Sequence, residues 1–136
     1  MITFTLSAPL KLMSLNQAFS TLRNGRRVKS KEYVLFEKEI KSLMSARIVD
    51  FKAFNDAYSP SNNEIHAHLL INTPNLYTKD GRISERSGDI DNSVKTLFDN
   101  VFVGDIDDSQ VTYLLVRKKH APTYSFTLQL KIANRE

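Results

Sequence analysis

The strongest constraint on the fold is the alternation of apolar and polar residues from Glu64 to Asn72, which only Leu70 interrupts. One face of this stretch is apolar and comprises Ile65, Ala67, Leu69 and Ile71. The opposite face carries Glu64, His66 and His68. A period of two is typical of a β-strand with one buried face. We therefore expect a sheet that buries one face against a second layer.

Similar patterns predict the remaining elements. Alternation indicates further strands over Ile2–Ser7, Val111–Arg117 and Tyr124–Ile132. Apolar residues at helical spacing predict a helix from a Ser30 cap to about Ile48 and a second from about Ile90 to Val101. The expected order is β-α-β-α-β-β. This order is typical of a small α/β or α+β domain in which helices cover one mixed sheet.

Each predicted helix has an apolar stripe that the sheet would bury. In the first helix the stripe consists of Tyr33, Phe36, Ile40, Leu43 and Met44. In the second helix it consists of Val94, Leu97, Phe98 and Val101.

The connections between these elements are polar. Ser14–Lys29 has no clear period and is expected to be irregular, and a short basic turn containing Lys118, Lys119 and Pro122 joins the last two predicted strands. Thr73–Gly88 contains Pro74 and an Asp80–Gly81 pair, again without periodicity. A structureless loop of this length is uncommon in a compact domain and is often functional.

Length and composition limit the classes of protein to which the chain can belong. The 136 residues suffice for a single domain over 1–136, and the absence of cysteine excludes disulfides, thiolate zinc sites and a cysteine nucleophile. The chain has neither an apolar run long enough for a membrane helix nor a convincing signal peptide. We expect a protein of a reducing intracellular compartment that needs no organic cofactor.

The net charge of +4 conceals an uneven distribution. Residues 80–108 hold eight acidic and three basic side chains, whereas the rest of the chain is strongly basic. The acidic segment over residues 80–108 would attract a cation, and the basic remainder of the chain would attract an anionic partner.

The acidic residues form two groups on either side of the second predicted helix. Asp89 and Asp91 precede or begin this helix, with Lys95 one turn further on, and Asp107 and Asp108 stand just before the next strand. Oxygen ligands without cysteine favour a hard cation such as Mg²⁺ or Mn²⁺. An ion of this kind activates water for attack on phosphorus, and a neighbouring lysine stabilises the charge that develops on the phosphate.

Structural roles for the same residues stay open. Asp at a helix start is often only a cap, Asp91 and Lys95 have the spacing of an ordinary helix ion pair, and Asp107 and Asp108 could be turn residues.

The acidic residues and their neighbours resemble a motif of the RusA family of Holliday junction resolvases. The motif reads Asp89-x-Asp91-Asn92, then Lys95 and Asp99, then Asp107-Asp108-x-Gln110-Val111. The segment Ser14–Asn16, followed by a basic loop that leads into a helix, is similar to the N-terminal region of that family. The resemblance covers most of the chain and is most specific over residues 88–111.

This resemblance implies a homodimer that binds four-way DNA junctions and nicks two opposed strands with Mg²⁺, for which Mn²⁺ would substitute. By position, the essential acids fall on Asp89, Asp91 and Asp108, and the essential lysine falls on Lys95. Asp107 would be an additional metal ligand beside Asp108. The expected products are a 5′-phosphate and a 3′-hydroxyl, and the expected location is the cytoplasm of a bacterial or phage-infected cell.

The chain departs from the family pattern in two places. The segment between the two acid groups is about two residues shorter, which leaves open whether Asp107 or Asp108 points into the site. The loop before Asp89 is long and its basic residues are spread out, which leaves junction and sequence preference open.

Basic residues are expected to hold the DNA arms through phosphate contacts. The candidate DNA-binding residues are Asn16, Arg23, Arg26, Arg27, Lys29, Lys79, Arg82 and Arg86. Each basic residue among them could equally be a solvated surface charge.

Other functions remain open. The same acids would serve a Mg²⁺-dependent nucleotide phosphohydrolase, although the chain has no glycine-rich phosphate loop. A non-catalytic protein that binds junctions or other DNA is a third possibility. Glu64, His66 and His68 could ligate zinc, and Phe19, Tyr58 and Tyr77 could stack on unpaired bases, but a half-exposed strand and the rim of a core explain them as well.

Overall fold

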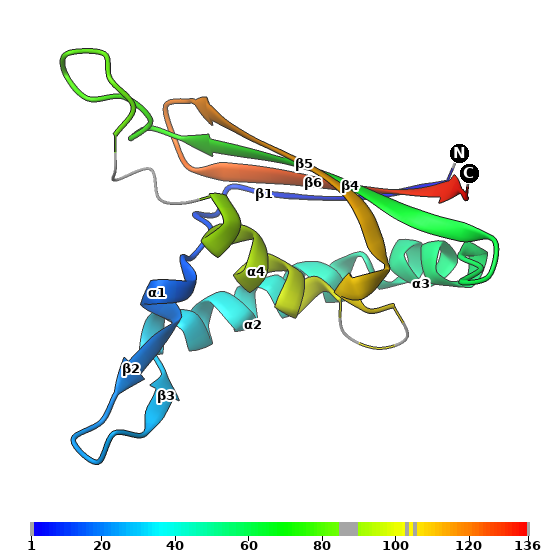
Figure 1. The fold of residues 1–136 in the computed structure, drawn as a ribbon, viewed down its shortest axis with the longest axis horizontal. Helices are drawn as coiled ribbons and strands as arrows, with labels where there is room; N and C mark the ends of the chain where they lie inside the picture. The colour runs from blue at the N-terminus through cyan, green and yellow to red at the C-terminus, as the bar shows by residue number, and fades with distance from the viewer. Residues whose placement is uncertain (1, 85–89, 103, 105, 136) are drawn as a thin grey trace.

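The structure is a computed structural model that describes residues 2–84, 90–102, 104 and 106–135. Its centre is a four-stranded sheet of β1 (Thr3–Ala8), β4 (Asn63–Thr73), β5 (Val111–His120) and β6 (Ser125–Asn134) (Figure 1). The strand order is β1-β6-β4-β5. β6 is antiparallel to both of its neighbours, whereas β4 and β5 are parallel. The prediction of a mixed sheet is confirmed.

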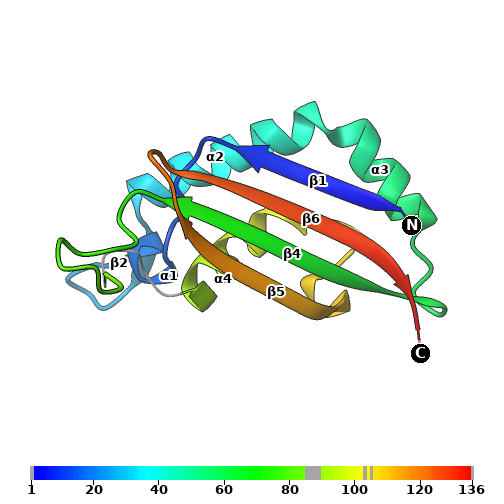
Figure 2. The same ribbon diagram turned by 90° about the horizontal axis from the view of Figure 1, so that it is seen from above.

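Helices cover one face of this sheet. Figure 1 shows α2 (Lys31–Ala46), α3 (Ile48–Ala57) and α4 (Ile90–Val101) below the strands. Viewed from above in Figure 2, the strands lie in front and the helices behind. The protein is thus a small α+β domain, as the patterns predicted.

The core lies between the two layers. β4 contributes the four apolar residues predicted for its buried face, and every one of them is less than a tenth exposed. Phe4 and Leu6 of β1 and Leu128 of β6 extend this apolar surface. Ile40 of α2, Phe54 of α3 and Leu97 of α4 close the core from the other side.

The first predicted helix is confirmed as α2, and a further helix that the sequence did not predict follows it. Ser30 is the N-cap of α2 and its hydroxyl accepts a hydrogen bond from the Tyr33 N–H at 3.1 Å, as the sequence indicates. α2 ends at Ala46, and α3 begins at Ile48. The sequence prediction missed α3, because only Phe51 and Phe54 of this helix are buried and two aromatic residues make a weak pattern.

The segment predicted to be irregular also contains ordered structure. Ser14 caps a single-turn helix, α1 (Leu15–Ala18). A two-stranded ribbon of β2 (Phe19–Thr21) and β3 (Arg27–Lys29) follows, and Gly25 in its turn has a φ of 82°. This left-handed conformation costs glycine little and most other residues much more. The basic loop is therefore a β-hairpin, which we call the basic hairpin (residues 19–29).

The polar loop after β4 also differs from the prediction. Thr78 N–H donates to the Arg82 carbonyl at 2.8 Å, Ser84 N–H donates to the Leu76 carbonyl at 2.8 Å, and Tyr77 and Ile83 form an isolated β-bridge. Gly81 adopts a φ of 84° in the turn between them. Asp-Gly is a strong hairpin signal, so the turn over residues 76–84 could have been recognised from the sequence.

A short connection joins the last two strands, as predicted, but these strands are not neighbours in the sheet. Lys118 and Lys119 belong to β5, which is longer than predicted. The connection from His120 to Ser125 passes the end of β4, where the Ala121 N–H donates to the Thr73 carbonyl at 3.1 Å. β4 thus separates β5 from β6 and leaves β5 at the edge of the sheet.

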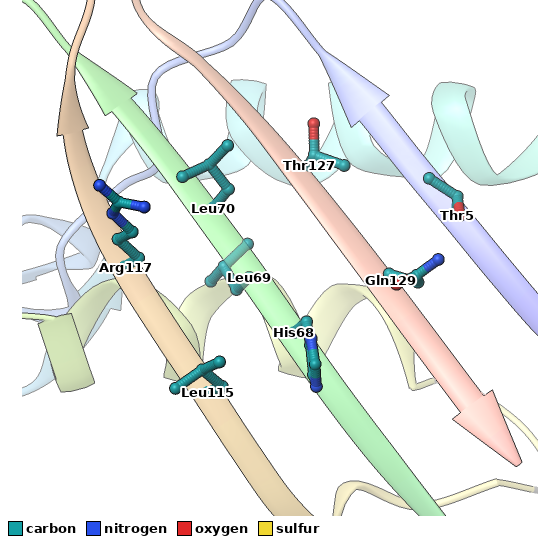
Figure 3. A pocket seen from close by; sticks show the side chains of 8 residues that line it. All are labelled: Thr5, His68, Leu69, Leu70, Leu115, Arg117, Thr127 and Gln129. Carbon is teal, nitrogen blue, oxygen red and sulfur yellow. The ribbon is translucent and has the colours of Figure 1, made fainter.

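The face of the sheet away from the helices is open. Figure 3 shows side chains from all four strands around a shallow pocket of about 350 Å³, with His68 of β4 between Leu115 of β5 and Gln129 of β6. Within the described residues, no helix has the length and apolar character that crossing a membrane would require.

Candidate functional site: an acidic pocket between α4 and β5

α4 separates an apolar face from a charged one. Val94, Leu97, Phe98 and Val101 are buried, as the sequence predicted. Asp91, Lys95 and Asp99 follow one another at intervals of four residues. Residues four apart lie on the same side of a helix, so the three charges form one row along α4.

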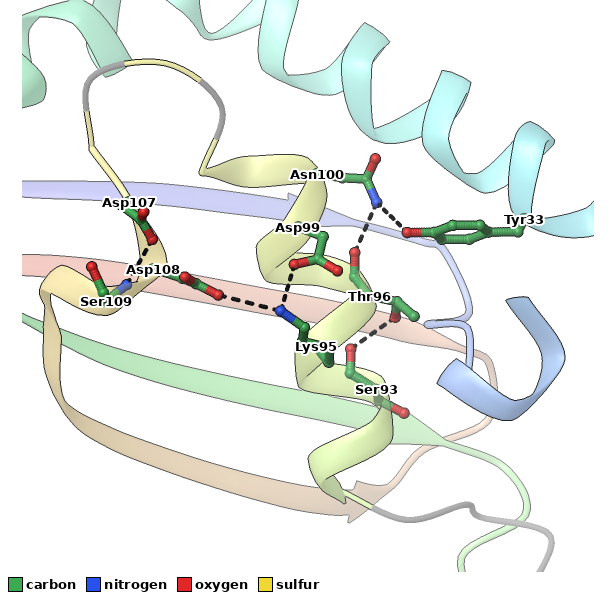
Figure 4. Close-up of polar contacts among 9 residues, drawn as sticks. All are labelled: Tyr33, Ser93, Lys95, Thr96, Asp99, Asn100, Asp107, Asp108 and Ser109. Carbon is green, nitrogen blue, oxygen red and sulfur yellow. Dashed lines mark hydrogen bonds and ion pairs between the residues drawn. The ribbon is translucent and has the colours of Figure 1, made fainter. Parts of the chain in front are cut away.

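Two buried polar residues fix the position of α4. The Thr96 hydroxyl donates to the carbonyl of Met13, and Asn100 Nδ2 donates to the Tyr33 hydroxyl at 3.4 Å. Both side chains also contact carbonyl groups within α4 (Figure 4). Since Thr96 and Asn100 are at most 5% exposed, these bonds form away from bulk water and orient the charged row outward.

A short 3-10 helix, Asp108–Gln110, carries the second acid group. Asp107 is its N-cap, and the carboxylate of Asp107 accepts a hydrogen bond from the Ser109 N–H at 2.9 Å. Gln110 accepts a hydrogen bond from the Tyr58 hydroxyl at 2.6 Å, which ties this turn to the end of α3. These contacts hold Asp108 beside α4.

Lys95 joins the two acid groups. Its Nζ lies 2.9 Å from Asp99 Oδ1 and 3.7 Å from Asp108 Oδ2 (Figure 4). The hydrogen bond to Asp99, with a further contribution from Asp108, raises the pKa of Lys95 above its ordinary value. The lysine is thus held in its charged form between two carboxylates.

The neighbouring carboxylates of Asp107 and Asp108 affect each other in opposite directions. The Ser109 N–H lowers the pKa of Asp107 by stabilising its charge. A hydrogen bond with Asp107 and partial burial raise the pKa of Asp108, although Lys95 opposes this shift. The two pKa values are thus shifted apart, with that of Asp108 raised and that of Asp107 lowered.

These groups line a pocket of about 390 Å³, which we call the α4–β5 pocket. Its charged residues are Asp91, Lys95 and Asp108. Its apolar walls are formed by Ile90, Val94, Phe98, Val111, Leu114 and Val116. Three of the four residues to which the resemblance assigns catalysis thus share one pocket, while the fourth, Asp89, lies outside the described residues.

The geometry also distinguishes Asp107 from Asp108. Asp108 lines the pocket and contacts Lys95, whereas Asp107 is exposed and caps the 3-10 helix. Asp108 is accordingly the better candidate for a role inside the site. The alternative ion pair of Asp91 with Lys95 is not observed, because Lys95 points to Asp99 and Asp108.

The ligand atoms that the pocket offers are of the chemical type that a hard cation prefers. Its acidic side chains supply oxygen atoms only, the ligands that Mg²⁺ and Mn²⁺ prefer. Within the described ranges, no group of three or more acidic or histidine side chains is close enough to hold a metal ion. Asp91 and Asp108 line the pocket, whereas Asp89, which the resemblance adds to them, lies outside the described residues.

Asp99 is a member of this site that the sequence analysis did not assign to it. Asp99 makes the shorter of the two ion pairs of Lys95. The signal was present in the sequence, since Lys95 and Asp99 have the i, i+4 spacing of a helix ion pair.

The predicted DNA-binding residues gather at one end of the molecule. Figures 1 and 2 both show α1, the basic hairpin and the turn over residues 76–84 at the end where α4 begins. This end carries Asn16 on α1, Arg23, Arg26, Arg27 and Lys29 on the hairpin, and Lys79 and Arg82 on the turn. Arg86 lies outside the described residues.

These residues differ in how firmly they are held. Arg27 lies over the Phe19 ring at 4.7 Å, Lys29 pairs with Glu37 at 3.1 Å, and Arg82 pairs with Asp80 at 2.8 Å. Arg23 and Arg26 are exposed near the hairpin tip. The hairpin thus combines anchored and exposed cations, and all of them are accessible to a large anionic partner.

The other residues singled out from the sequence have structural contacts. His66 hydrogen-bonds Glu64 at 2.7 Å, and the Tyr113 ring lies within 6 Å of both histidine rings. The hydrogen bond with His66 lowers the pKa of Glu64.

Of the three candidate stacking aromatics, two are held by the fold. Phe19 packs against Tyr33, and Tyr58 hydrogen-bonds Gln110. Tyr77 is about half exposed and lies 5.9 Å from the His120 ring.

The chain matches no known protein-family model, and no curated protein is similar to it in sequence. The functional interpretation therefore depends on the pocket itself and on the sequence pattern around it.

Proposed function

We propose that this protein is a metal-dependent, structure-selective DNA endonuclease that resolves four-way junctions by paired nicks. The observation that carries the proposal is the shared position of Asp91, Lys95 and Asp108 in the α4–β5 pocket, with Lys95 within 3.7 Å of Asp108. These are three of the residues that a RusA-type site requires. The fold brings them together although they belong to different segments.

The proposed cation would be held by Asp91 and Asp108 together with Asp89. When bound, Mg²⁺ would supply an activated water and offset charge on the scissile phosphate. The ammonium of Lys95 is held close to Asp108 and would stabilise negative charge on the phosphate oxygens. Asp99 acts as a positioning residue because it fixes the Lys95 side chain from the other side.

The basic end of the molecule would hold the DNA arms. A duplex carries a dense row of phosphates, and exposed arginine and lysine side chains bind it by displacing counterions. The basic hairpin and the turn over residues 76–84 lie at the end where the charged row of α4 begins. A DNA strand held by these residues would pass beside the α4–β5 pocket.

The proposal includes a homodimer, because two opposed nicks require two sites related by two-fold symmetry. It also includes a location in the cytoplasm, where bacterial or phage DNA is accessible.

The deciding experiment is a cleavage assay on a synthetic four-way junction and a linear duplex of matched sequence, each with Mg²⁺ and with EDTA. We expect symmetric nicks in the junction only, and only with Mg²⁺. Junction binding without cleavage would instead support a DNA-binding protein. Hydrolysis of nucleoside triphosphates without cleavage would support a nucleotide phosphohydrolase.

Asp91→Asn tests the role of the pocket in the same assay. Loss of a metal ligand should abolish nicking, while junction binding should persist or tighten because a repelling charge is removed. Asp56→Asn is the matched control, since Asp56 is an exposed acid on α3 that does not line the pocket. Loss of both binding and cleavage in Asp91→Asn alone would show that Asp91 has a structural role.

A further inference from the structure

β5 presents an unpaired edge. It is ten residues long and pairs with β4 on one side, and the strand order places no other described strand beyond it. Figure 2 shows β5 at one edge of the sheet, with β1 at the other. The outer N–H and C=O groups of an edge strand are where another strand can add to a sheet.

The middle of this edge is apolar. Tyr113, Leu114 and Leu115 are consecutive and are 49%, 44% and 51% exposed, respectively. Edge strands of monomeric proteins are usually short or interrupted by charge, because a long apolar edge pairs with other chains. β5 carries charges only toward its end, so its central part has the character of an interface.

The apolar residues face both sides of the sheet. Leu115 lies on the open face together with Arg117 (Figure 3). Leu114 and Val116 lie on the helix side, where they line the α4–β5 pocket. A strand added to this edge would therefore bury apolar surface on both faces and would border the pocket.

The charges at the two ends of β5 indicate what that strand is. Asp107 and Asp108 precede β5, and Arg117, Lys118 and Lys119 stand toward its end. A second copy of β5, aligned antiparallel, would place the basic end of each strand opposite the acidic start of the other. The same alignment would place Tyr113 of one copy opposite Leu115 of the other, with Leu114 near the axis. The edge is thus complementary to itself in charge and in apolar character.

We propose that two copies of this chain pair through their β5 edges, antiparallel and about a two-fold axis near Leu114, to form one continuous eight-stranded sheet. Such a contact is isologous, because each copy uses the same patch. The proposal rests on the proposed function in one respect: it names the partner that paired nicking requires.

This arrangement has a consequence for the pocket. An axis perpendicular to the sheet places both α4–β5 pockets on the same face of the dimer, one on each side of the axis. Since Leu114 lines the pocket and lies near the axis, the partner strand would form part of the wall of each pocket. The basic end of the partner strand would approach Asp108.

The first test measures the mass of the free protein by size-exclusion chromatography with light scattering, without DNA or metal. We expect twice the mass of one chain. The double variant Tyr113→Lys with Leu115→Lys should give the mass of one chain, because like charges would meet across the interface. The matched control is Leu35→Lys with Val49→Lys, which alters similarly exposed apolar residues on α2 and α3 and should remain a dimer. Circular dichroism would verify that each variant folds.

The second test uses the absence of native cysteine. Single cysteines are introduced at each position from 112 to 117, and disulfide formation between copies is measured under mild oxidation. Antiparallel pairing predicts a maximum at Leu114→Cys or Leu115→Cys and a decrease toward both ends, because only residues near the axis meet their own copy. Similar cross-linking at every position would contradict the antiparallel register.

The proposed β5 interface and the proposed function can be contradicted independently of each other. A monomeric wild-type protein, or a dimer that survives the double lysine variant, would overturn the β5 interface. A β5 dimer that cuts no junction would leave the interface in place and overturn the proposed function.

Discussion

Lys95 and Asp108 approach to 3.7 Å across the α4–β5 pocket, although one lies on α4 and the other in the 3-10 helix before β5. The contact depends on the β4–α4–β5 crossover, which returns the chain to the side of α4 after the helix has ended. The Asp107 cap and the hydrogen bond from Tyr58 to Gln110 then fix the turn. The site is therefore a product of the parallel pairing of β4 with β5.

Lys95 and Asp99 should differ strongly in their effect on nicking. Lys95→Met removes the ammonium that would stabilise charge on the phosphate, and loss of one such group typically lowers a rate about 10²–10³-fold. Asp99→Asn removes only the ion pair that positions Lys95, so we expect a decrease of less than about tenfold. Single-turnover cleavage of a four-way junction measures both. Equal losses would show that the two residues act as one unit.

The exposed arginines of the basic hairpin should contribute to DNA binding through the phosphate backbone. In the double variant Arg23→Ala with Arg26→Ala, junction affinity should fall, and the slope of log K against log salt should decrease by about 0.9 for each phosphate that is no longer neutralised. The control is Lys41→Ala with Lys52→Ala, which removes two exposed lysines from α2 and α3. Fluorescence anisotropy over a range of salt concentrations measures these slopes. Equal slopes in the two double variants would contradict a role for the hairpin.

The sheet and the face of α4 could be predicted from the sequence because their patterns are long. Apolar residues occupy every second position from Ile65 to Ile71, and the stripe from Val94 to Val101 has helical spacing over most of α4. α3 was missed because two buried aromatics do not define a period. The basic hairpin was missed because its strands are three residues long and face solvent on most positions.

The geometry of the site was only partly predictable. The sequence pointed to Asp91, Lys95 and Asp108, but the distance between the two acid groups depends on the pairing of β4 with β5, which joins distant segments of the chain. The sequence left open an ion pair of Lys95 with Asp91, whereas the structure shows Asp99 and Asp108 as the partners of Lys95. Asp91 and Asp99 are each four residues from Lys95, so spacing alone did not distinguish them.

The hydrogen bond from Thr96 to Met13 should be important for stability. Thr96→Val keeps the shape of this fully buried side chain but leaves the Met13 carbonyl without this donor. An unsatisfied buried polar group typically costs about 1–3 kcal/mol. Urea unfolding should show a loss of this size for Thr96→Val and a change of less than about 0.5 kcal/mol for Thr21→Val on the exposed strand β2. A loss below this range would indicate that water replaces the Thr96 hydroxyl.

The hydrogen bond between Glu64 and His66 should make stability depend on pH. This bond lowers the pKa of Glu64 in the folded protein below its ordinary value of 4.5, so the unfolded chain binds a proton more readily than the folded chain. The contribution of Glu64 is therefore fully present above pH 4.5 and is lost as the pH falls through the lower folded value. Wild-type protein should be more stable than Glu64→Gln at pH 7, and the difference should shrink as the pH falls below 4.5 and through the lower folded value. Urea unfolding at a series of pH values measures this difference. A constant difference across the series would show that the Glu64 charge does not contribute.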